Sequence, residues 1–207
     1  GYRTYNVAAP LSETLGAAIV LLSRYRRDLP LVDPMCGAGT MPIEAAMIAR
    51  NQAPGMHRSF AAERYAFLDL AAMARERERA RDAVEDAALD ILGLDLDPRC
   101  IDLCKKHAKK AGVMLQWGVA DVRDLPPREG RGIVVCNPPY GERMLDRRAA
   151  ADLYRQMRRA LDRRPGWSRH IITGHPRFER EYGARADKRR KLSNGGMVCT
   201  LYQYFAK

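Results

Sequence analysis

Long apolar stretches are absent from this chain of 207 residues. No run of about 18 apolar residues occurs, so the sequence predicts no membrane-spanning helix and no membrane partner. The first five residues, Gly-Tyr-Arg-Thr-Tyr, resemble neither a signal peptide nor an initiator sequence. We therefore expect a cytoplasmic protein, and we expect the sequence to be a piece of a longer one. With 46% hydrophobic residues it can bury the core of a single domain.

Paired cysteines are also missing. The five cysteines are scattered along the chain, and no two of them form a C-x-x-C pair. They are Cys36, Cys100, Cys104, Cys136 and Cys199. This pattern indicates neither a disulfide framework nor a zinc site, so we expect no metal and a reducing compartment.

Positive charge, by contrast, is in excess and unevenly placed, with a formal net charge of +11. Residues 1–140 carry 19 Lys or Arg against 18 Asp or Glu, whereas residues 141–191 carry 16 against 7. A basic segment of this kind indicates a polyanionic partner that is held through salt-dependent contacts to phosphates. The alternative is a solvated arginine-rich surface without a ligand.

Short apolar segments alternate with helical patterns along the chain. Strands are predicted at 29–35, 89–97, 114–119, 133–136 and 169–174, helices at 12–26, 42–50, 67–88, 97–112 and 147–162, and a C-terminal hairpin at 188–192 and 198–205. Residues 51–88 interrupt the alternation with a Pro-Gly turn at 54–55 and a helix rich in Arg and Glu. Strands that alternate with helices predict an α/β sheet of the nucleotide-binding type.

The fourth predicted strand, Ile-Val-Val-Cys at 133–136, runs directly into Asn-Pro-Pro-Tyr at 137–140. Two consecutive prolines cannot continue a strand ladder, so the strand ends there, at the edge where parallel sheets bind ligands. The Asn137 amide oxygen and the Pro138 carbonyl can accept the two hydrogens of a planar amine, while Tyr140 stacks on the attached ring. The alternative is a proline-terminated strand with an exposed tyrosine.

The other predicted strands also end in residues that suit a ligand. Asp33 precedes the loop Cys-Gly-Ala-Gly-Thr at 36–40, whose glycines let the backbone approach a bound molecule. The loop is neither G-x-G-x-x-G nor a P-loop, so a ligand with a cationic amino-acid end is favoured over a pyrophosphate. Asp95 lies where related sheets bind ribose hydroxyls, and Asp121 lies within reach of an adenine amine.

Four segments in this order resemble the class I methyltransferases that depend on S-adenosylmethionine. They are Asp-Pro-Met-Cys-Gly-Ala-Gly-Thr at 33–40, Gly-Leu-Asp at 93–95, Gly-Val-Ala-Asp at 118–121 and Asn-Pro-Pro-Tyr-Gly-Glu-Arg at 137–143. Further details resemble the bacterial THUMP-containing guanine-N2 methyltransferases of large-subunit ribosomal RNA. These are Pro-Met-Cys at 34–36, Ala-Pro-Gly at 53–55, Gly-Glu-Arg at 141–143, and the basic run at 188–191 followed by Asn-Gly at 194–195.

The resemblance implies a Rossmann-like α/β fold, with a seven-stranded, mostly parallel sheet, helices on both faces and an antiparallel C-terminal strand. It implies that residues 1–207 form a single methyltransferase domain, which lacks the family's N-terminal RNA-binding THUMP domain. The implied methyl donor is S-adenosylmethionine, which leaves as S-adenosylhomocysteine. The implied partner is RNA, which we expect to be ribosomal.

The resemblance also implies roles for individual residues. The cofactor-binding set comprises Asp33, Cys36, Gly37, Gly39, Thr40, Asp95, Asp121 and Asn137, and the catalytic set comprises Asn137, Pro138 and Tyr140. Within the first set, Asp33 and the two glycines would contact the methionine part of the donor, Asp95 the ribose and Asp121 the adenine. The catalytic set would hold the target base.

Three other functions stay open at this point. Adenine amines in DNA or RNA and protein glutamine amides are methylated at similar Asn/Asp-Pro-Pro-Tyr sites. The basic segment argues against a protein substrate, and the Gly-Glu-Arg extension favours guanine. A non-catalytic cofactor-binding or RNA-binding fold is the remaining possibility.

Overall fold

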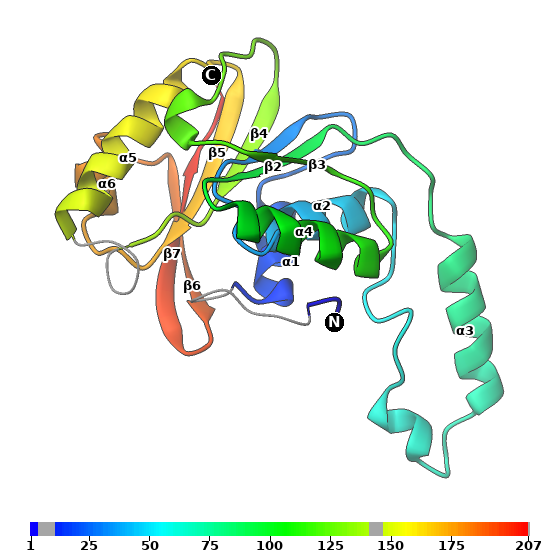
Figure 1. The fold of residues 1–207 in the computed structure, drawn as a ribbon. Helices are drawn as coiled ribbons and strands as arrows, with labels where there is room; N and C mark the ends of the chain where they lie inside the picture. The colour runs from blue at the N-terminus through cyan, green and yellow to red at the C-terminus, as the bar shows by residue number, and fades with distance from the viewer. Residues whose placement is uncertain (4–10, 141–146, 207) are drawn as a thin grey trace.

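The structure is a computed structural model that describes residues 1–3, 11–140 and 147–206. Within these residues seven strands form one sheet in the order β3-β2-β1-β4-β5-β7-β6 (Figure 1). The strands are β1 (Leu31–Asp33), β2 (Ile91–Asp95), β3 (Gln116–Val119), β4 (Gly132–Cys136), β5 (Trp167–Thr173), β6 (Lys188–Asn194) and β7 (Met197–Tyr204). Neighbouring strands are parallel except at β7, which runs antiparallel to both β5 and β6. The predicted Rossmann-like fold is confirmed.

Four helices, α1, α2, α4 and α5, lie close to their predicted positions, α3 is shorter than predicted, and α6 was not predicted. The helices are α1 (Glu13–Leu22), α2 (Thr40–Ala49), α3 (Leu70–Asp82), α4 (Pro98–Ala111), α5 (Arg147–Asp162) and α6 (Phe178–Tyr182), with 3-10 turns η1 (Ala61–Arg64) and η2 (Val122–Asp124). Ser12 caps α1 and Asp97 caps α4, each with a side-chain oxygen that accepts a backbone N–H. None of the helices in the described ranges is long and apolar enough to cross a membrane.

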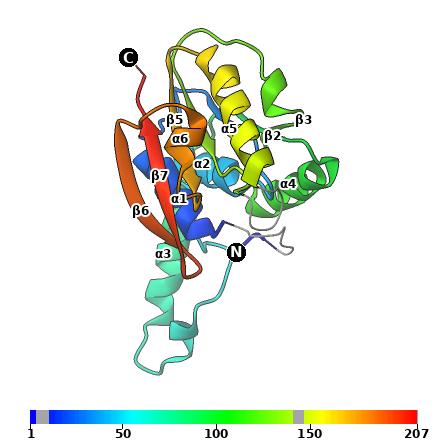
Figure 2. The same ribbon diagram turned by 90° about the vertical axis from the view of Figure 1, so that its left-hand side faces the viewer.

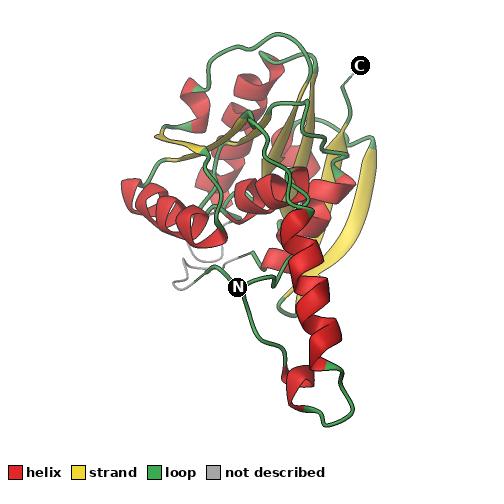
Figure 3. Ribbon diagram, turned by 90° about the vertical axis from the view of Figure 1, so that its right-hand side faces the viewer, coloured by secondary structure: helices red, strands yellow, loops and turns green. Residues whose placement is uncertain are grey.

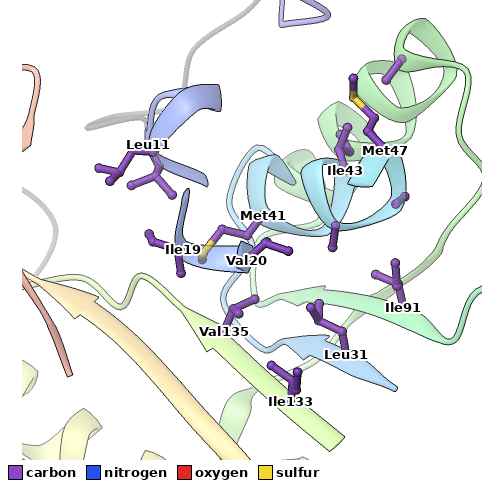
Figure 4. Close-up of a cluster of buried hydrophobic side chains, with 14 of the residues drawn as sticks. Leu11, Ile19, Val20, Leu31, Met41, Ile43, Met47, Ile91, Ile133 and Val135 are labelled. Atoms are coloured by element: carbon purple, nitrogen blue, oxygen red, sulfur yellow. The ribbon is translucent and has the colours of Figure 1, made fainter. Parts of the chain in front are cut away.

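Apolar side chains alternate between the two faces of the sheet, as the period of a strand requires. Leu31, Ile133 and Val135 belong to a cluster with residues of α1 and α2, and Figure 4 shows this cluster. Val32 and Val134 belong to a second cluster, which includes residues of α5 and α6 on the opposite face. Helices therefore cover both faces, and both clusters rigidly hold the central strands β1 and β4.

The strand order changes direction beside β1. The chain passes from β1 outward to β2 and β3, then returns to form β4 on the other side of β1. Ligands of open α/β sheets bind at this type of switch point, beyond the carboxyl ends of the strands. The hairpin of β6 and β7 forms the edge of the sheet that lies farthest from β3 (Figure 2).

Residues 51–88 project away from the sheet, with η1 and α3 at the outer end (Figures 1 and 3). Helix α3 is shorter than the predicted 67–88 at both ends. It starts later because Asp69 caps it, with a side chain that accepts from the backbone N–H of Ala71 and Ala72, and it ends at Asp82, with Ala83 as its C-cap. No residue of α3 is buried. Its alternating charges form surface ion pairs such as Arg79–Glu76, as the near-balance of signs predicts.

Glu44 on α2 provides a test of the packing between α2 and the chain start. Its carboxylate is buried and accepts a hydrogen bond of 2.9 Å from the Tyr2 hydroxyl, and burial raises the pKa of Glu44 from 4.5 to about 7. The folded state then holds a proton that the unfolded chain releases, so stability falls as the pH rises from 4.5 to about 7. We expect Glu44→Gln to remove about 3 kcal/mol of this pH dependence.

Urea denaturation between pH 4.5 and pH 8 measures the effect. Glu129→Gln serves as the control because Glu129 is exposed. An unchanged pH slope in Glu44→Gln would show that Glu44 is ionised in the folded protein.

Candidate functional site

A cavity of 680 Å³ lies at the carboxyl ends of β1, β2, β3 and β4. The segment after each of these strands contributes to its wall, and α5 forms another side. Residues that are far apart in the sequence therefore meet at one edge of the sheet, where the switch point lies. The size falls within the usual range for a small-molecule site.

The glycine loop between β1 and α2 forms one wall and is held by its neighbours. The Cys36 N–H donates to the Leu94 carbonyl at 2.8 Å, and the Gly37 N–H donates to Asp95 Oδ2 at 2.9 Å. From α4, the Cys104 thiol donates to the Gly37 carbonyl at 3.2 Å, and His107 Nδ1 lies 3.0 Å from the Ala38 carbonyl. Contacts from β2 and α4 thus fix the loop before any ligand binds.

Asp33 occupies the floor of the cavity and is only 1% exposed. Its Oδ1 accepts from the Met35 N–H at 3.2 Å, whereas its Oδ2 is buried without a partner among the described residues. Burial raises the pKa of this carboxyl well above its usual value, and the nearby Asp95 adds to the effect. A buried carboxylate oxygen of this kind requires a cationic or hydrogen-bonding partner, which a ligand ammonium group would supply.

Asp95 and Asp121 line the same cavity but already have partners. Asp95 accepts from Gly37 and, through Oδ1, from the Asp97 N–H at 3.0 Å. Asp121 Oδ1 accepts from the Arg123 N–H at 2.9 Å, and the hydrogen-bonded Arg123 guanidinium lowers the pKa of Asp121. Each carboxylate has acceptor capacity left for a ligand.

The Asn-Pro-Pro-Tyr turn at 137–140 follows β4 and opens into the cavity. Tyr154 of α5 donates from its hydroxyl to the Pro139 carbonyl at 3.0 Å, which anchors the turn. The Tyr140 hydroxyl donates to Met197 Sδ at 3.0 Å, at the start of β7. Cys136 is fully buried, Asn137 is partly exposed and Pro138 is buried again, so the residue predicted to bind a base amine is the first residue after β4 with an accessible side.

A comparison with known proteins decides the family. Residues 1–203 match the family described as RMKL-like, methyltransferase domain. The chain belongs to this methyltransferase family. The predicted resemblance to methyltransferases is therefore confirmed.

Relatives of this methyltransferase domain carry related names. The chain is 39% identical over 211 residues to "Putative RNA methyltransferase YpsC" of Bacillus subtilis (strain 168), covering 100% of this chain and 54% of that protein. It is 37% identical over 218 residues to "Ribosomal RNA large subunit methyltransferase K/L" of Aliivibrio salmonicida (strain LFI1238), covering 99% and 30%. The chain thus spans about half, or less, of the length of these relatives.

Solved structures of similar proteins share the whole fold of the methyltransferase domain. SMU.472, "a putative methyltransferase complexed with SAH", has a TM-score of 0.94 and 40% identity, covering 100% of this chain and 55% of that one. "A predicted N6-adenine-specific DNA methylase" from Listeria monocytogenes str. 4b F2365 has a TM-score of 0.91 and 40% identity, covering 100% and 54%. The names of these relatives differ in substrate, so the fold leaves the acceptor base open.

Nearly all of the residues predicted for the site of this methyltransferase domain line the one cavity. These are Asp33, Cys36, Gly37, Thr40, Asp95, Asp121, Asn137, Pro138 and Tyr140. Gly39 does not line it, and Gly-Glu-Arg at 141–143 lies outside the described residues. Sequence reasoning missed lining residues that come from other elements, namely Leu11, Leu96, Cys100, Arg123, Ala149, Asp152, Leu153, Gln156 and Met197. Of these, Asp152 and Gln156 could have been found from the sequence, because they are polar residues one turn apart on a predicted amphipathic helix.

Gly39 has a packing role that can be tested. Its φ is +80°, and a Cβ there would lie 2.9 Å from both Cys104 Sγ and the Trp117 ring. Gly112 has a similar φ of +73° with nothing within 4 Å of a Cβ, so it is a matched control. We expect Gly112→Ala to cost about 1–2 kcal/mol of unfolding free energy and Gly39→Ala about 2–4 kcal/mol. Equal losses of unfolding free energy in the two variants, measured by urea denaturation, would contradict the close packing of Cys104 and Trp117 against Gly39.

No group of three or more His, Cys, Asp or Glu residues with the spacing of a metal site occurs in the described part of this methyltransferase domain. The described cysteines are all free thiols. Cys36 and Cys104 lie with their sulfur atoms 3.7 Å apart beneath the glycine loop, while Cys100 lines the cavity.

Proposed function

We propose that this domain transfers a methyl group from S-adenosylmethionine to the exocyclic amine of a guanine in large-subunit ribosomal RNA. One observation carries the proposal: Asn137 opens into the same cavity as the carboxylate oxygen of Asp33 that has no partner among the described residues. The amide proposed to bind the target base and the acid proposed to bind the methyl donor thus face one cavity at the switch point of the sheet. The names of the relatives supply the RNA substrate.

The residues present fit the proposed methyl donor. Asp33 Oδ2 is buried, anionic when ionised and without a partner, which suits the ammonium group of the methionine part. Asp95 would accept from the ribose hydroxyls, and Asp121 would accept from the adenine amine. The apolar walls of the cavity would bury the rest of the molecule. When bound, S-adenosylmethionine supplies an electrophilic methyl group on a sulfonium centre.

The acceptor side compensates for the weak nucleophilicity of a base amine, whose lone pair is delocalised into the ring. The Asn137 amide oxygen and the Pro138 carbonyl would each accept one amine hydrogen, which favours a tetrahedral nitrogen with its lone pair directed outward. The neighbouring Pro139 carbonyl is already engaged by Tyr154, so the turn presents these acceptors in a fixed geometry. Positioning of this kind supplies much of the rate enhancement in a transfer between two bound groups.

Tyr140 would stack on the target base, which must be unpaired or flipped to reach the cavity. Its hydroxyl is held by Met197, so the ring is oriented before the base arrives. An asparagine cannot act as a general base, and the proton therefore leaves to water after methyl transfer. The site needs no histidine or cysteine for this chemistry.

The second candidate is methylation of an adenine amine, which the name of the Listeria protein favours. Both bases present a planar amine, and the residues at 137–140 suit either one. The excess of basic residues after Tyr140 favours a nucleic acid over a protein substrate.

Incubation with S-adenosylmethionine that carries a deuterated methyl group tests the proposal. The purified chain is given unmodified ribosomal RNA, or DNA in a parallel reaction, and the products are digested to nucleosides for mass spectrometry. We expect labelled N2-methylguanosine from RNA. Labelled N6-methyladenosine or its DNA counterpart would support the second candidate, and no label in any nucleoside would contradict both.

A further inference from the structure

A second cavity of 320 Å³ lies between η2 and α5, which are packed side by side. Its wall consists of Arg123, Gln156, Arg159, Ala160 and Arg163, and we call it the arginine groove. Arg123 and Gln156 also line the larger cavity, so the two spaces share a wall. The lining residues belong to η2, to the C-terminal half of α5 and to the residue that follows α5, and η2 and α5 lie side by side (Figure 1).

Two of the three guanidinium groups in the arginine groove have no carboxylate partner in the part of the chain that the structure describes. Arg123 is paired with Asp121, but Arg159 has no ion pair or hydrogen bond to any described residue. Arg163 donates through Nη2 to the carbonyls of Arg123 and Leu125, at 2.9 Å and 2.8 Å. The lining includes no acid. Positive charge is therefore left over at this place.

Two other arginines on α5 have carboxylate partners. Arg155 is paired with Asp152, and Arg158 with Asp162. Arg148, at the start of α5, also has no ion pair or hydrogen bond to any described residue, but it does not line the groove. Arg159 and Arg163 differ from it because they line one concave space whose wall includes Arg123 and Gln156 of the larger cavity. Guanidinium groups in a concave site with free donors suit a phosphate, which accepts several hydrogen bonds at once.

We propose that the arginine groove binds a backbone phosphate of the RNA strand whose target base enters the larger cavity. The inference rests on the proposed function, and it assigns the phosphate contact to Arg159 and Arg163. Phosphate contacts fix the register of a nucleic acid without reading its sequence. The groove would therefore set which nucleotide of the strand reaches Asn137.

Arg159 is the residue to change, because it is exposed and holds no other element in place. Arg159→Ala removes the charge, and Arg159→Lys keeps it. Lys106→Ala on the outer face of α4 is the matched control, since it removes one exposed cation away from the groove. The assay measures methyl transfer by the full chain to unmodified ribosomal RNA at several salt concentrations, together with the affinity for S-adenosylhomocysteine.

Arg159→Ala is expected to raise the KM for RNA about 5- to 10-fold at 0.15 M salt and to lower the slope of log KM against log salt by about 1. Arg159→Lys should keep a slope close to that of the unchanged chain. Affinity for S-adenosylhomocysteine should stay the same in all variants. If Arg159→Ala behaves like Lys106→Ala while the unchanged chain methylates RNA, the groove is not a phosphate site. If the unchanged chain methylates no RNA, the proposed function fails and this inference fails with it.

Discussion

Replacing Asn137 with alanine is expected to lower kcat for methyl transfer by about 10²- to 10³-fold, the range seen when one transition-state hydrogen bond is removed. The amide oxygen would accept a hydrogen of the target amine, and this contact strengthens as the nitrogen becomes tetrahedral. Loss of an interaction of that kind lowers kcat and kcat/KM together. The dissociation constant for S-adenosylhomocysteine should change by no more than a few fold, because Asp33 and Asp95 would hold the donor.

Asn137→Asp is the matched control for this prediction. Aspartate keeps an oxygen acceptor at the same position and similar volume, so we expect it to retain part of the activity that alanine loses. Single-turnover kinetics measures the rate of methyl transfer, and titration calorimetry measures the affinity for S-adenosylhomocysteine. A parallel loss of methyl transfer and donor affinity in Asn137→Ala would assign Asn137 to the donor site instead.

Asp33→Asn is expected to lower the affinity for S-adenosylmethionine about 10²- to 10³-fold, which corresponds to about 3–4 kcal/mol. The asparagine can still accept from the Met35 N–H, so the local backbone should keep its conformation. It can no longer offer a negative charge to the ammonium group of the ligand. Asp124→Asn is the control, because Asp124 is exposed on the neighbouring turn η2 and does not line the cavity.

Asp33→Asn should also raise the stability of the folded chain in the absence of ligand. Burial raises the pKa of Asp33 above 3.8, so the folded chain holds a proton that the unfolded chain releases, and stability falls as the pH rises above 3.8. Asparagine carries no such charge, and Asp33→Asn should therefore melt at a higher temperature at pH 7.5. Binding of a cationic ligand requires the ionised carboxylate, so affinity should rise with pH in the unchanged chain and lose this dependence in the variant. Unchanged affinity in Asp33→Asn would exclude Asp33 from the donor site.

Much of this fold is predictable because local patterns and tertiary packing agree. The apolar run before Asn137 is fully buried, and the double proline ends it where the sequence requires. Helix α5 has its predicted limits, since its inward residues recur at helical spacing. The short helix α6 was not predicted. It has only five residues and depends on the burial of Phe178 and Tyr182 rather than on a periodic pattern.

The site was predictable only where its residues follow strand ends. Asp33, Asp95, Asp121 and Asn137 meet because parallel strands place their carboxyl ends at one edge. Met197 lies 57 residues beyond Tyr140 and contacts it only because β7 lies beside β5. Likewise Gly39 is close to Cys104 of α4 and Trp117 of β3 because both elements pack against the loop. Sequence spacing carries no information on such contacts between distant segments.

Replacing Asn137 in the cell tests the proposed guanine methylation most directly. A strain of the source organism is given the single chromosomal change Asn137→Ala, which leaves every other part of the encoded protein intact. Its large-subunit ribosomal RNA is digested to nucleosides and analysed by mass spectrometry beside that of the parent strain. We expect the loss of one N2-methylguanosine with all other methylated nucleosides retained. Unchanged N2-methylguanosine, or the loss of a methylated adenosine in its place, would contradict the proposed guanine methylation.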